Sequence, residues 1–206
     1  IQYESQTPAG EWQRKMNLIA GVGGFGPIID NVIEQTTKRI IGDLVPHKME
    51  TSMTYGSWTS PYCPDPRRFS DTSIERYNEG CLFWVYIGHG NRQCLDKVHM
   101  PNAKHPILDQ QSVPKINCRC GNPIAVFLAC YTNAFDSIED CIAEQMLLQP
   151  GGPVATIGGS RVTMPGGMGL LSMQLMDEYF SGDAKTLGDV FLKAKRRLAF
   201  SEDQFG

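Results

Sequence analysis

Two reactive side chains follow two apolar runs in this sequence, and together they could break an acyl bond. His89 lies in 88-GHG-90, directly after the run 81-CLFWVYI-87, and Cys130 ends the run 124-IAVFLAC-130. The thiolate of a cysteine is a nucleophile. A histidine, which titrates near neutral pH, can take the thiol proton and return it to a leaving amine. These residues therefore predict nucleophilic catalysis by a Cys-His dyad.

The glycine after the histidine could supply a further part of such a site. Gly90 has no side chain, so its backbone can approach a substrate carbonyl closely. Its N–H, together with that of Cys130, could stabilise the oxyanion that forms when a thiolate attacks a carbonyl carbon. We therefore expect an oxyanion hole made of backbone N–H groups.

The two apolar runs must be strands if His89 and Cys130 are to meet. Both runs are continuously apolar and end at turn residues, which is typical of parallel strands that are buried on both faces. Parallel strands bring their carboxyl ends to one edge of the sheet, and ligands bind beyond that edge. His89 and Cys130 are therefore expected to be neighbours there, although they are far apart in the sequence.

Each residue also has a plainer interpretation. A cysteine at the end of an apolar strand is often a small buried hydrophobic residue, and a histidine in a turn is often structural. The coincidence of two strand ends favours the dyad, because it matches the edge where ligands bind. The other histidines, His47, His99 and His105, lie in expected loops and have no comparable placement.

The rest of the chain alternates expected strands and helices, which indicates an α/β fold with a mostly parallel sheet and helices on both faces. Further strands are expected at 16–21, 48–54 and 153–159, and helices at 27–44, 71–79, 137–149, after 167 and from Thr186. Ser137 and Asp140 predict a capping-box start for the helix over 137–149. Cys141 is expected to pack in the core, on one helix face with Ile138 and Ile142.

The seven cysteines indicate free thiols rather than a metal site or a disulfide framework. Their number is odd, and no two of them form the C-x-x-C pair that many structural zinc sites use. The close pair in 118-CRC-120 has a spacing unusual for tetrahedral zinc. We therefore expect neither a metal nor a cofactor to be required for catalysis.

One glycine pattern suggests a different class of protein. Residues 21-GVGGFG-26 match G-x-G-x-x-G between an expected strand and an expected helix, which is the context of a dinucleotide-binding turn. The acidic residue that should meet the ribose is not clearly placed, and Glu50 is the nearest candidate. A glycine-rich turn also serves any site where backbone must come close to a catalytic group. A dinucleotide-binding oxidoreductase therefore stays as the least favoured alternative.

Charge argues against nucleic-acid binding, and the length of the apolar runs argues against a membrane span. The formal net charge is −3, from 19 Lys and Arg against 22 Asp and Glu, which provides no basic field for nucleic acid. No apolar run approaches the ~18 residues of a membrane span. The first residue is Ile1 rather than Met, so we expect the 206 residues to be one domain of a longer protein with other domains.

Two residue pairs carry a resemblance to a known family, namely 89-HG-90 and 129-AC-130. With the downstream stretch 129-ACYTNAFDSIEDCIAEQMLLQPGGPVATIGGSR-161, the chain resembles the gingipain-type cysteine peptidases of the caspase-fold group. The resemblance implies a caspase-like three-layer α/β/α sandwich and hydrolysis of polypeptides through a thioester acyl-enzyme. It also implies Cys130 as nucleophile, His89 as general base and acid, and an extracytoplasmic or secreted location.

The chain departs from this family at one position. Gingipains have a glutamate near the end of the first strand that orients the catalytic histidine, whereas 20-AGVGGFG-26 contains no carboxylate. Asp30, one turn into the following helix, is the nearest substitute. A backbone carbonyl could orient His89 instead, or the domain could be catalytically silent and serve as a binding module. Some relatives also carry a structural calcium ion, which this sequence does not indicate.

The loop 160-SRVTMP-165 resembles the wall of the family's primary specificity pocket, so Ser160 and Arg161 are expected to bind substrate. Arg161 could hold an acidic substrate side chain through a bidentate fork. The alternative is a structural ion pair between Arg161 and a nearby Asp or Glu.

Overall fold

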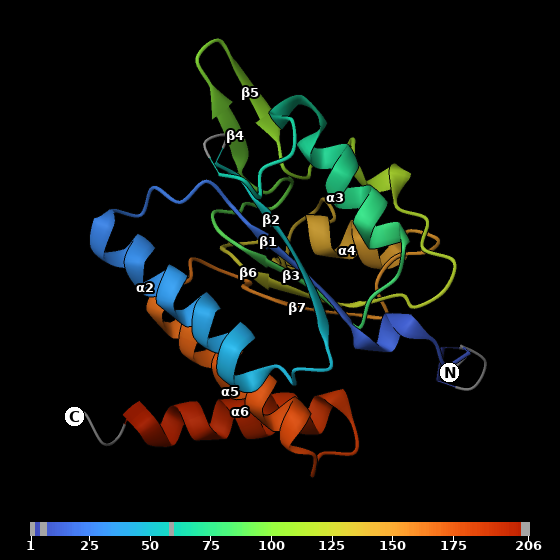
Figure 1. The fold of residues 1–206 in the computed structure, drawn as a ribbon, viewed down its shortest axis with the longest axis vertical. Coiled ribbons are helices and arrows are strands. Elements are labelled where there is room, and N and C mark those ends of the chain that lie inside the picture. The colour runs from blue at the N-terminus through green and yellow to red at the C-terminus, as the bar shows by residue number, and fades with distance from the viewer. Residues whose placement is uncertain (1–2, 5–7, 58–59, 203–206) are drawn as a thin grey trace. The chain divides into compact units, whose positions relative to one another are not determined.

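The computed structural model describes residues 3–4, 8–57 and 60–202, and the chain in it separates into two compact units (Figure 1). One unit consists of Ile1–Gly23 and Glu50–Thr163, and the other of Gly24–Met49 and Met164–Gly206. The first unit contains the sheet and both residues of the predicted dyad.

The first unit is built on a five-stranded sheet in the order β2-β1-β3-β6-β7, and every neighbouring pair of strands is parallel. The strands are β1 (Lys15–Ala20), β2 (Glu50–Tyr55), β3 (Phe83–Ile87), β6 (Ile124–Leu128) and β7 (Ala155–Gly158). The apolar runs that predicted the two strands of the dyad are β3 and β6, which lie next to each other in the sheet. The expected mostly parallel sheet is therefore confirmed.

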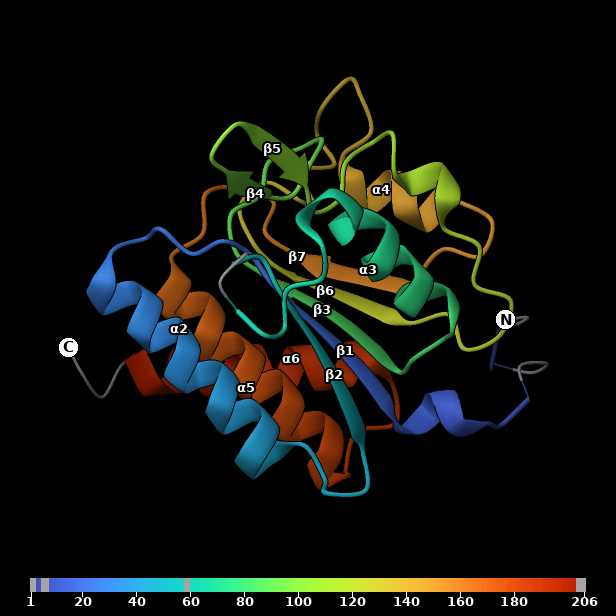
Figure 2. The same ribbon diagram turned by 45° about the horizontal axis from the view of Figure 1, so that its top comes forward.

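The core of the first unit lies between the sheet and two helices on one of its faces, α3 (Phe69–Asn78) and α4 (Ile142–Leu148), as Figure 2 shows. Trp84 joins these elements, with ring centroids 6.1 Å from Tyr77 of α3 and 5.5 Å from Phe127 of β6. Full burial of one large apolar side chain contributes roughly 1.5–3 kcal/mol, so this cluster holds β3 and β6 firmly.

The expected start of α4 was wrong. The helix begins at Ile142 rather than at residue 137, and its capping interaction runs from the N–H of Cys141 to the carboxylate of Glu144 at 2.9 Å. The reason is tertiary, because the N–H of Ile142 donates to Arg92 O at 2.6 Å and so holds this point of the chain. Cys141 is buried as expected, but Ile138 is fully exposed.

A hairpin between β3 and β6 was not expected. It consists of β4 (Lys97–Met100) and β5 (Ala103–Pro106), which pair antiparallel and project from the sheet in Figure 1. Each strand is only four residues long and mixes polar with apolar residues, so no apolar run marks it. Short 3-10 turns at Glu11–Arg14, Pro66–Arg68 and Val113–Lys115 connect other elements of this unit.

The second unit contains α2 (Pro27–Arg39), a π-helical turn at Ile40–Leu44, α5 (Pro165–Ser181) and α6 (Leu187–Glu202). Helices α2 and α5 lie side by side in both ribbon views, where a Cβ on Gly169 would meet Thr36 Cγ2 at 3.2 Å. Thr186 caps α6 by accepting the N–H of Asp189 at 3.1 Å, as expected. Among the helices of the described residues, none has the length and apolar character that a membrane span requires.

Candidate active site

The parallel register brings His89 and Cys130 to the same level of neighbouring strands. Ile87 pairs with Leu128 at the carboxyl ends of β3 and β6, and each reactive residue follows two positions later. The ladder continues one step beyond the strands, because the N–H of Gly88 donates to Leu128 O at 3.3 Å. Two runs that are distant in sequence thus deliver a histidine and a cysteine to one edge of the sheet.

Gly90 packs directly on the backbone around Cys130. A Cβ on Gly90 would lie 2.9 Å from Ala129 Cβ, 2.9 Å from Thr132 Cγ2 and 3.0 Å from Cys130 O. Contacts below 3.0 Å are essentially unknown for real Cβ atoms, so only glycine fits here without a shift of the neighbouring chain. The segment after β3 therefore lies against the segment after β6.

The N–H groups proposed for the oxyanion hole are not used by the backbone. Within the described part of the chain, neither Gly90 nor Cys130 donates its N–H to a backbone carbonyl. Both residues are only partly buried, so water can satisfy these N–H groups. Both N–H groups come from the same pair of adjoining segments.

Four small residues form a row across the carboxyl edge of the sheet, and we call them the small-residue row: Gly56, Gly21, Gly88 and Ala129. Each is the first residue after its strand, in β2, β1, β3 and β6 respectively. Ladder hydrogen bonds of 2.8, 2.8 and 3.3 Å join them to the strand ends, from Gly56 N to Ala20 O, from Gly21 N to Ile87 O and from Gly88 N to Leu128 O. The small size of these residues lets neighbouring chain segments and the Tyr86 hydroxyl pack closely against them.

Tyr86 holds the backbone of His89, a contact that could not be expected from the sequence. Its hydroxyl donates to His89 O at 2.6 Å and accepts the N–H of Asp96 at 3.3 Å. Burial, together with the negative charge of Asp96, raises the pKa of the Tyr86 hydroxyl well above its ordinary value, so it remains a donor at physiological pH. The only sequence signal is the position of a tyrosine three residues before the histidine in 86-YIGH-89.

The thiol of Cys130 lies against Thr163, in the loop that follows β7. The N–H of Thr163 donates to Cys130 Sγ at 3.4 Å, and Thr163 Oγ1 lies 3.5 Å from the same sulfur. Sγ can also donate to Thr163 O at 3.7 Å while it is protonated. These contacts hold the Cys130 sulfur against the loop that follows β7.

The residue after the nucleophile has an unusual backbone conformation. Tyr131 has φ 56°, and no other described residue except glycine has a positive φ. Such a conformation costs about 1–3 kcal/mol and occurs mainly where function requires it. The turn is held by the N–H of Tyr131, which donates to Arg161 O at 3.2 Å, and by Arg92, whose guanidinium lies 5.9 Å from the Tyr131 ring centroid.

Arg161 makes a bidentate ion pair with Asp136. Its Nη1 and Nη2 donate to the two carboxylate oxygens at 3.0 and 2.6 Å, and Nη1 also donates to Ser160 O at 2.7 Å. The hydrogen bonds from Arg161 lower the pKa of Asp136 below its ordinary value. The pair thus links the loop after Cys130 to the loop after β7.

The side chain of Asp30 binds the backbone of the turn just before its own helix. Its carboxylate oxygens accept the N–H groups of Gly24 and Phe25, each at 3.2 Å, within the second unit. The glycine-rich stretch 21–26 therefore has two parts. Gly21 belongs to the small-residue row, and the turn after it is closed by Asp30. Two N–H groups that a pyrophosphate would need are already occupied.

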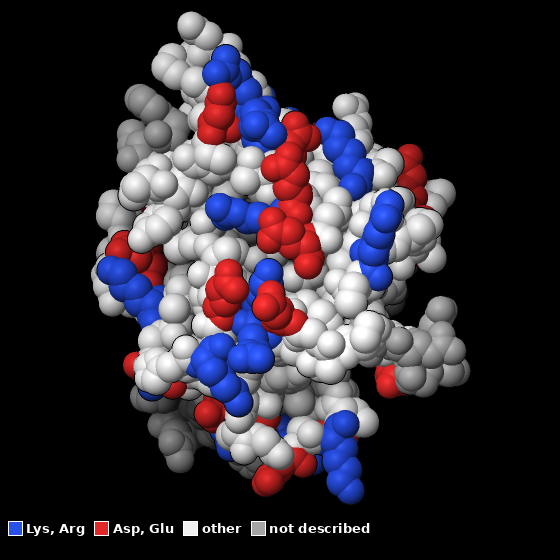
Figure 3. Space-filling view, turned by 45° about the vertical axis from the view of Figure 1, so that its right-hand side comes forward, with Lys and Arg blue, Asp and Glu red and all other residues white. Residues whose placement is uncertain are grey.

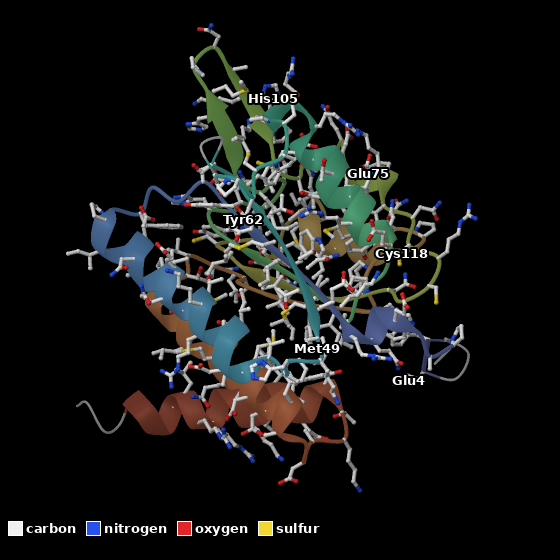
Figure 4. All side chains as sticks on the ribbon, viewed as in Figure 1. Glu4, Met49, Tyr62, Glu75, His105 and Cys118 are labelled. Carbon is white, nitrogen blue, oxygen red and sulfur yellow. The ribbon has the colours of Figure 1, made fainter. Side chains whose placement is uncertain are left out.

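All seven cysteines are free thiols, and burial raises the pKa of four of them: Cys63, Cys81, Cys118 and Cys141. Figure 4 labels Cys118 on a loop beyond α3, away from His105 on the hairpin. In the described part of the chain, no group of three or more His, Cys, Asp and Glu side chains could hold a metal ion. Figure 3 shows acidic and basic side chains interspersed on one face, without a large field of one sign.

Comparisons with known proteins agree with this geometry. The family model described as Peptidase family C25 matches residues 1–205. The structure of the Arg-specific cysteine proteinase gingipain R (RgpB) superimposes with a TM-score of 0.66 at 17% identity, over 97% of this chain and 45% of that chain.

Two further structures match similarly. A complex of Porphyromonas gingivalis RgpB pro- and mature domains has a TM-score of 0.67 at 15% identity, over 96% of this chain and 45% of that one. A structure described only as a protease has a TM-score of 0.71 at 15% identity, over 98% and 45%. No curated protein sequence matches this chain. The caspase-like α/β fold is thus confirmed, in a chain that spans less than half the length of these structures.

Proposed function

We propose that this chain, which belongs to peptidase family C25, hydrolyses peptide bonds with Cys130 as nucleophile and His89 as general base and acid. The observation that best supports the proposal is the shared level of the two residues at the ends of β3 and β6. The packing of Gly90 on Cys130 O supports it further, because it joins the two segments that carry the dyad.

In the proposed mechanism, His89 takes the proton of the Cys130 thiol, and the thiolate attacks the carbonyl carbon of the substrate. The negative charge moves to the carbonyl oxygen, where the N–H groups of Gly90 and Cys130 stabilise it. The C–N bond then breaks, and His89 returns the proton to the leaving amine. A water, deprotonated by His89, finally hydrolyses the thioester and releases the acid and the thiol.

Thr163 has a supporting part in this mechanism. Its N–H and hydroxyl lie 3.4 and 3.5 Å from Cys130 Sγ, and donation from either one stabilises a thiolate. Because the N–H belongs to the backbone, replacement of the side chain removes only one of the two donors. We propose that Thr163 holds the Cys130 sulfur in place for attack and that Thr163→Val lowers the rate of alkylation of Cys130 at neutral pH.

The ion pair with Asp136 bears on the part of Arg161 in substrate recognition. An acidic substrate side chain would have to displace Asp136, which already occupies both arms of the Arg161 fork. We propose that the pair mainly holds the two loops together and that Ser160 contacts substrate through its backbone. Peptide libraries test this, because a strong preference for Asp or Glu that is lost in Arg161→Ala would restore the recognition role.

Selective alkylation tests the dyad. At neutral pH, iodoacetamide should label Cys130 faster than Cys120, an exposed thiol that serves as the internal reference in the same digest. His89→Ala should slow the labelling of Cys130 and leave that of Cys120 unchanged, and the same variant should lose hydrolysis of fluorogenic peptides. Equal rates for the two thiols in both proteins would contradict the dyad and favour a catalytically silent binding module.

A further inference from the structure

We infer that Tyr86 is a positioning residue for the reaction, since its hydroxyl sets the place of the His89 backbone at the edge of the sheet. The inference rests on the proposed function, because it concerns the histidine that acts as base and acid.

The contact from Tyr86 to His89 is short and rigidly supported. The hydroxyl donates to His89 O at 2.6 Å from a side chain that is 0% exposed, in the middle of the core cluster. A wholly buried ring on a central strand has little freedom to move. The turn of 88-GHG-90 has glycine on both sides of His89, so it has little stiffness of its own. The N–H of Gly88 is bound to Leu128 O, and Gly90 pairs with Leu95 in an isolated antiparallel bridge. The Tyr86 hydroxyl adds the contact at His89 itself, between these two points.

Asp96 braces the same hydroxyl from the other side. Its N–H donates to Tyr86 Oη at 3.3 Å, and its carboxylate accepts the N–H of Val22 at 3.2 Å and that of Lys97 at 2.8 Å. Val22 follows the end of β1, so Asp96 connects that strand end to the segment after β3. The tyrosine hydroxyl lies at the centre of this connection.

The small-residue row provides the space that the hydroxyl occupies. A Cβ on Gly21 would lie 2.9 Å from Tyr86 Oη, and a Cβ on Gly88 would lie 2.6 Å from the same atom. Any larger residue at either position would push the phenol away from His89 O. Two glycines on different strands thus fit one hydroxyl, which a merely space-filling aromatic residue would not require.

The chemical consequence follows from the precision that proton transfer needs. A displacement of about 1 Å in a catalytic group can cost roughly 100-fold in rate. Without the Tyr86 hydroxyl, the carbonyl of His89 loses a hydrogen-bond donor, and the backbone that carries the imidazole ring is less firmly held. Substrate binding depends on other contacts, so the effect should fall on kcat rather than on KM.

Tyr86→Phe tests the inference, and Tyr77→Phe is the matched control. Tyr77 is also buried, but its hydroxyl has no hydrogen-bond partner among the described residues. In the full chain, Tyr86→Phe should lower kcat about 10- to 100-fold with KM changed less than about 2-fold. Tyr77→Phe should change neither. Asp96→Ala, which keeps the backbone N–H but loses the brace to Val22, should have a smaller effect than Tyr86→Phe.

A second readout separates failure of this inference from failure of the proposed function. The ring signals of His89 in a ¹H–¹⁵N NMR spectrum should shift in Tyr86→Phe, while those of His47, in the second unit, should not. An active wild type with unchanged kcat in Tyr86→Phe would overturn the inference alone, as would unshifted His89 signals in a folded variant. An inactive wild type in which His89 signals still shift would contradict the proposed function and keep the positioning role.

Discussion

Cys81 and Cys130 lie at opposite edges of the sheet, next to the neighbouring strands β3 and β6. Cys81 comes two residues before β3, at the amino edge of the sheet, and Cys130 comes two residues after β6, at the carboxyl edge. Cys81 is 0% exposed and has a pKa raised to about 12, mainly by burial. Cys130 is only partly buried and receives the N–H of Thr163. The same residue type thus has different surroundings at the two edges.

The difference comes from what the chain does beyond each edge. At the amino edge, the N–H of Cys81 donates to Gly121 O at 3.1 Å, and the side chain of Asn17 donates to Cys81 Sγ at 3.4 Å. At the carboxyl edge, the N–H groups of Gly90 and Cys130 make no backbone hydrogen bond in the described part of the chain. The backbone and the thiol of Cys81 are thus bonded within the chain, whereas the two N–H groups at the carboxyl edge have no backbone acceptor among the described residues.

The largest expected effect separates the two cysteines by activity. Cys130→Ala should lower kcat/KM at least about 10³-fold, because no other group can form the acyl-enzyme. Cys81→Ala should leave kcat/KM within about 3-fold and instead lower the free energy of unfolding by about 1–2 kcal/mol. Peptide hydrolysis and urea unfolding of both variants check this. Loss of activity in a folded Cys81→Ala would remove the distinction between the edges.

A smaller effect is expected at Gly90, which joins the two segments of the carboxyl edge. Gly90→Ala forces a Cβ into contacts of 2.9–3.0 Å with residues 129–132, so the two segments must separate. We expect kcat/KM to fall about 10- to 100-fold, in line with the loss of one oxyanion donor or less. Gly166→Ala is the control, because a Cβ there meets nothing within 4 Å. Equal kinetics for the two variants would argue against an oxyanion hole at Gly90.

The smallest effect concerns the pH dependence of stability at the amino edge. The pKa of Cys81 is raised from 9.0 to about 12, so the folded state holds a proton that the unfolded state releases above pH 9. Its contribution is complete below pH 9 and is lost as the pH rises toward 12. Between pH 8 and 10 the free energy of unfolding should fall about 1 kcal/mol more in wild type than in Cys81→Ala. The free energy of unfolding is measured by urea titration at each pH. If it falls equally with pH in wild type and in Cys81→Ala, then Cys81 ionises equally in the folded and unfolded states.

Much of the carboxyl edge could be predicted from sequence, because long apolar runs identify central strands and strand ends identify the edge. The runs of β3 and β6 were therefore recognisable as parallel strands, which places His89 and Cys130 after the same edge of the sheet. The start of α4 could not be predicted in this way, because Ile142 is held by Arg92 O, a contact between distant segments. The brace between Tyr86 and Asp96 is likewise tertiary, and one tyrosine in an apolar run does not reveal it.

The small-residue row has a consequence for where ligand specificity can vary. All four of its members are buried, and a Cβ on Gly56, Gly21 or Gly88 would lie 3.1, 2.9 or 2.6 Å from its nearest neighbour. A close-packed layer cannot accept larger side chains unless the backbone shifts. Differences in specificity must therefore come from the loops beyond the edge, while the layer beneath them stays unchanged.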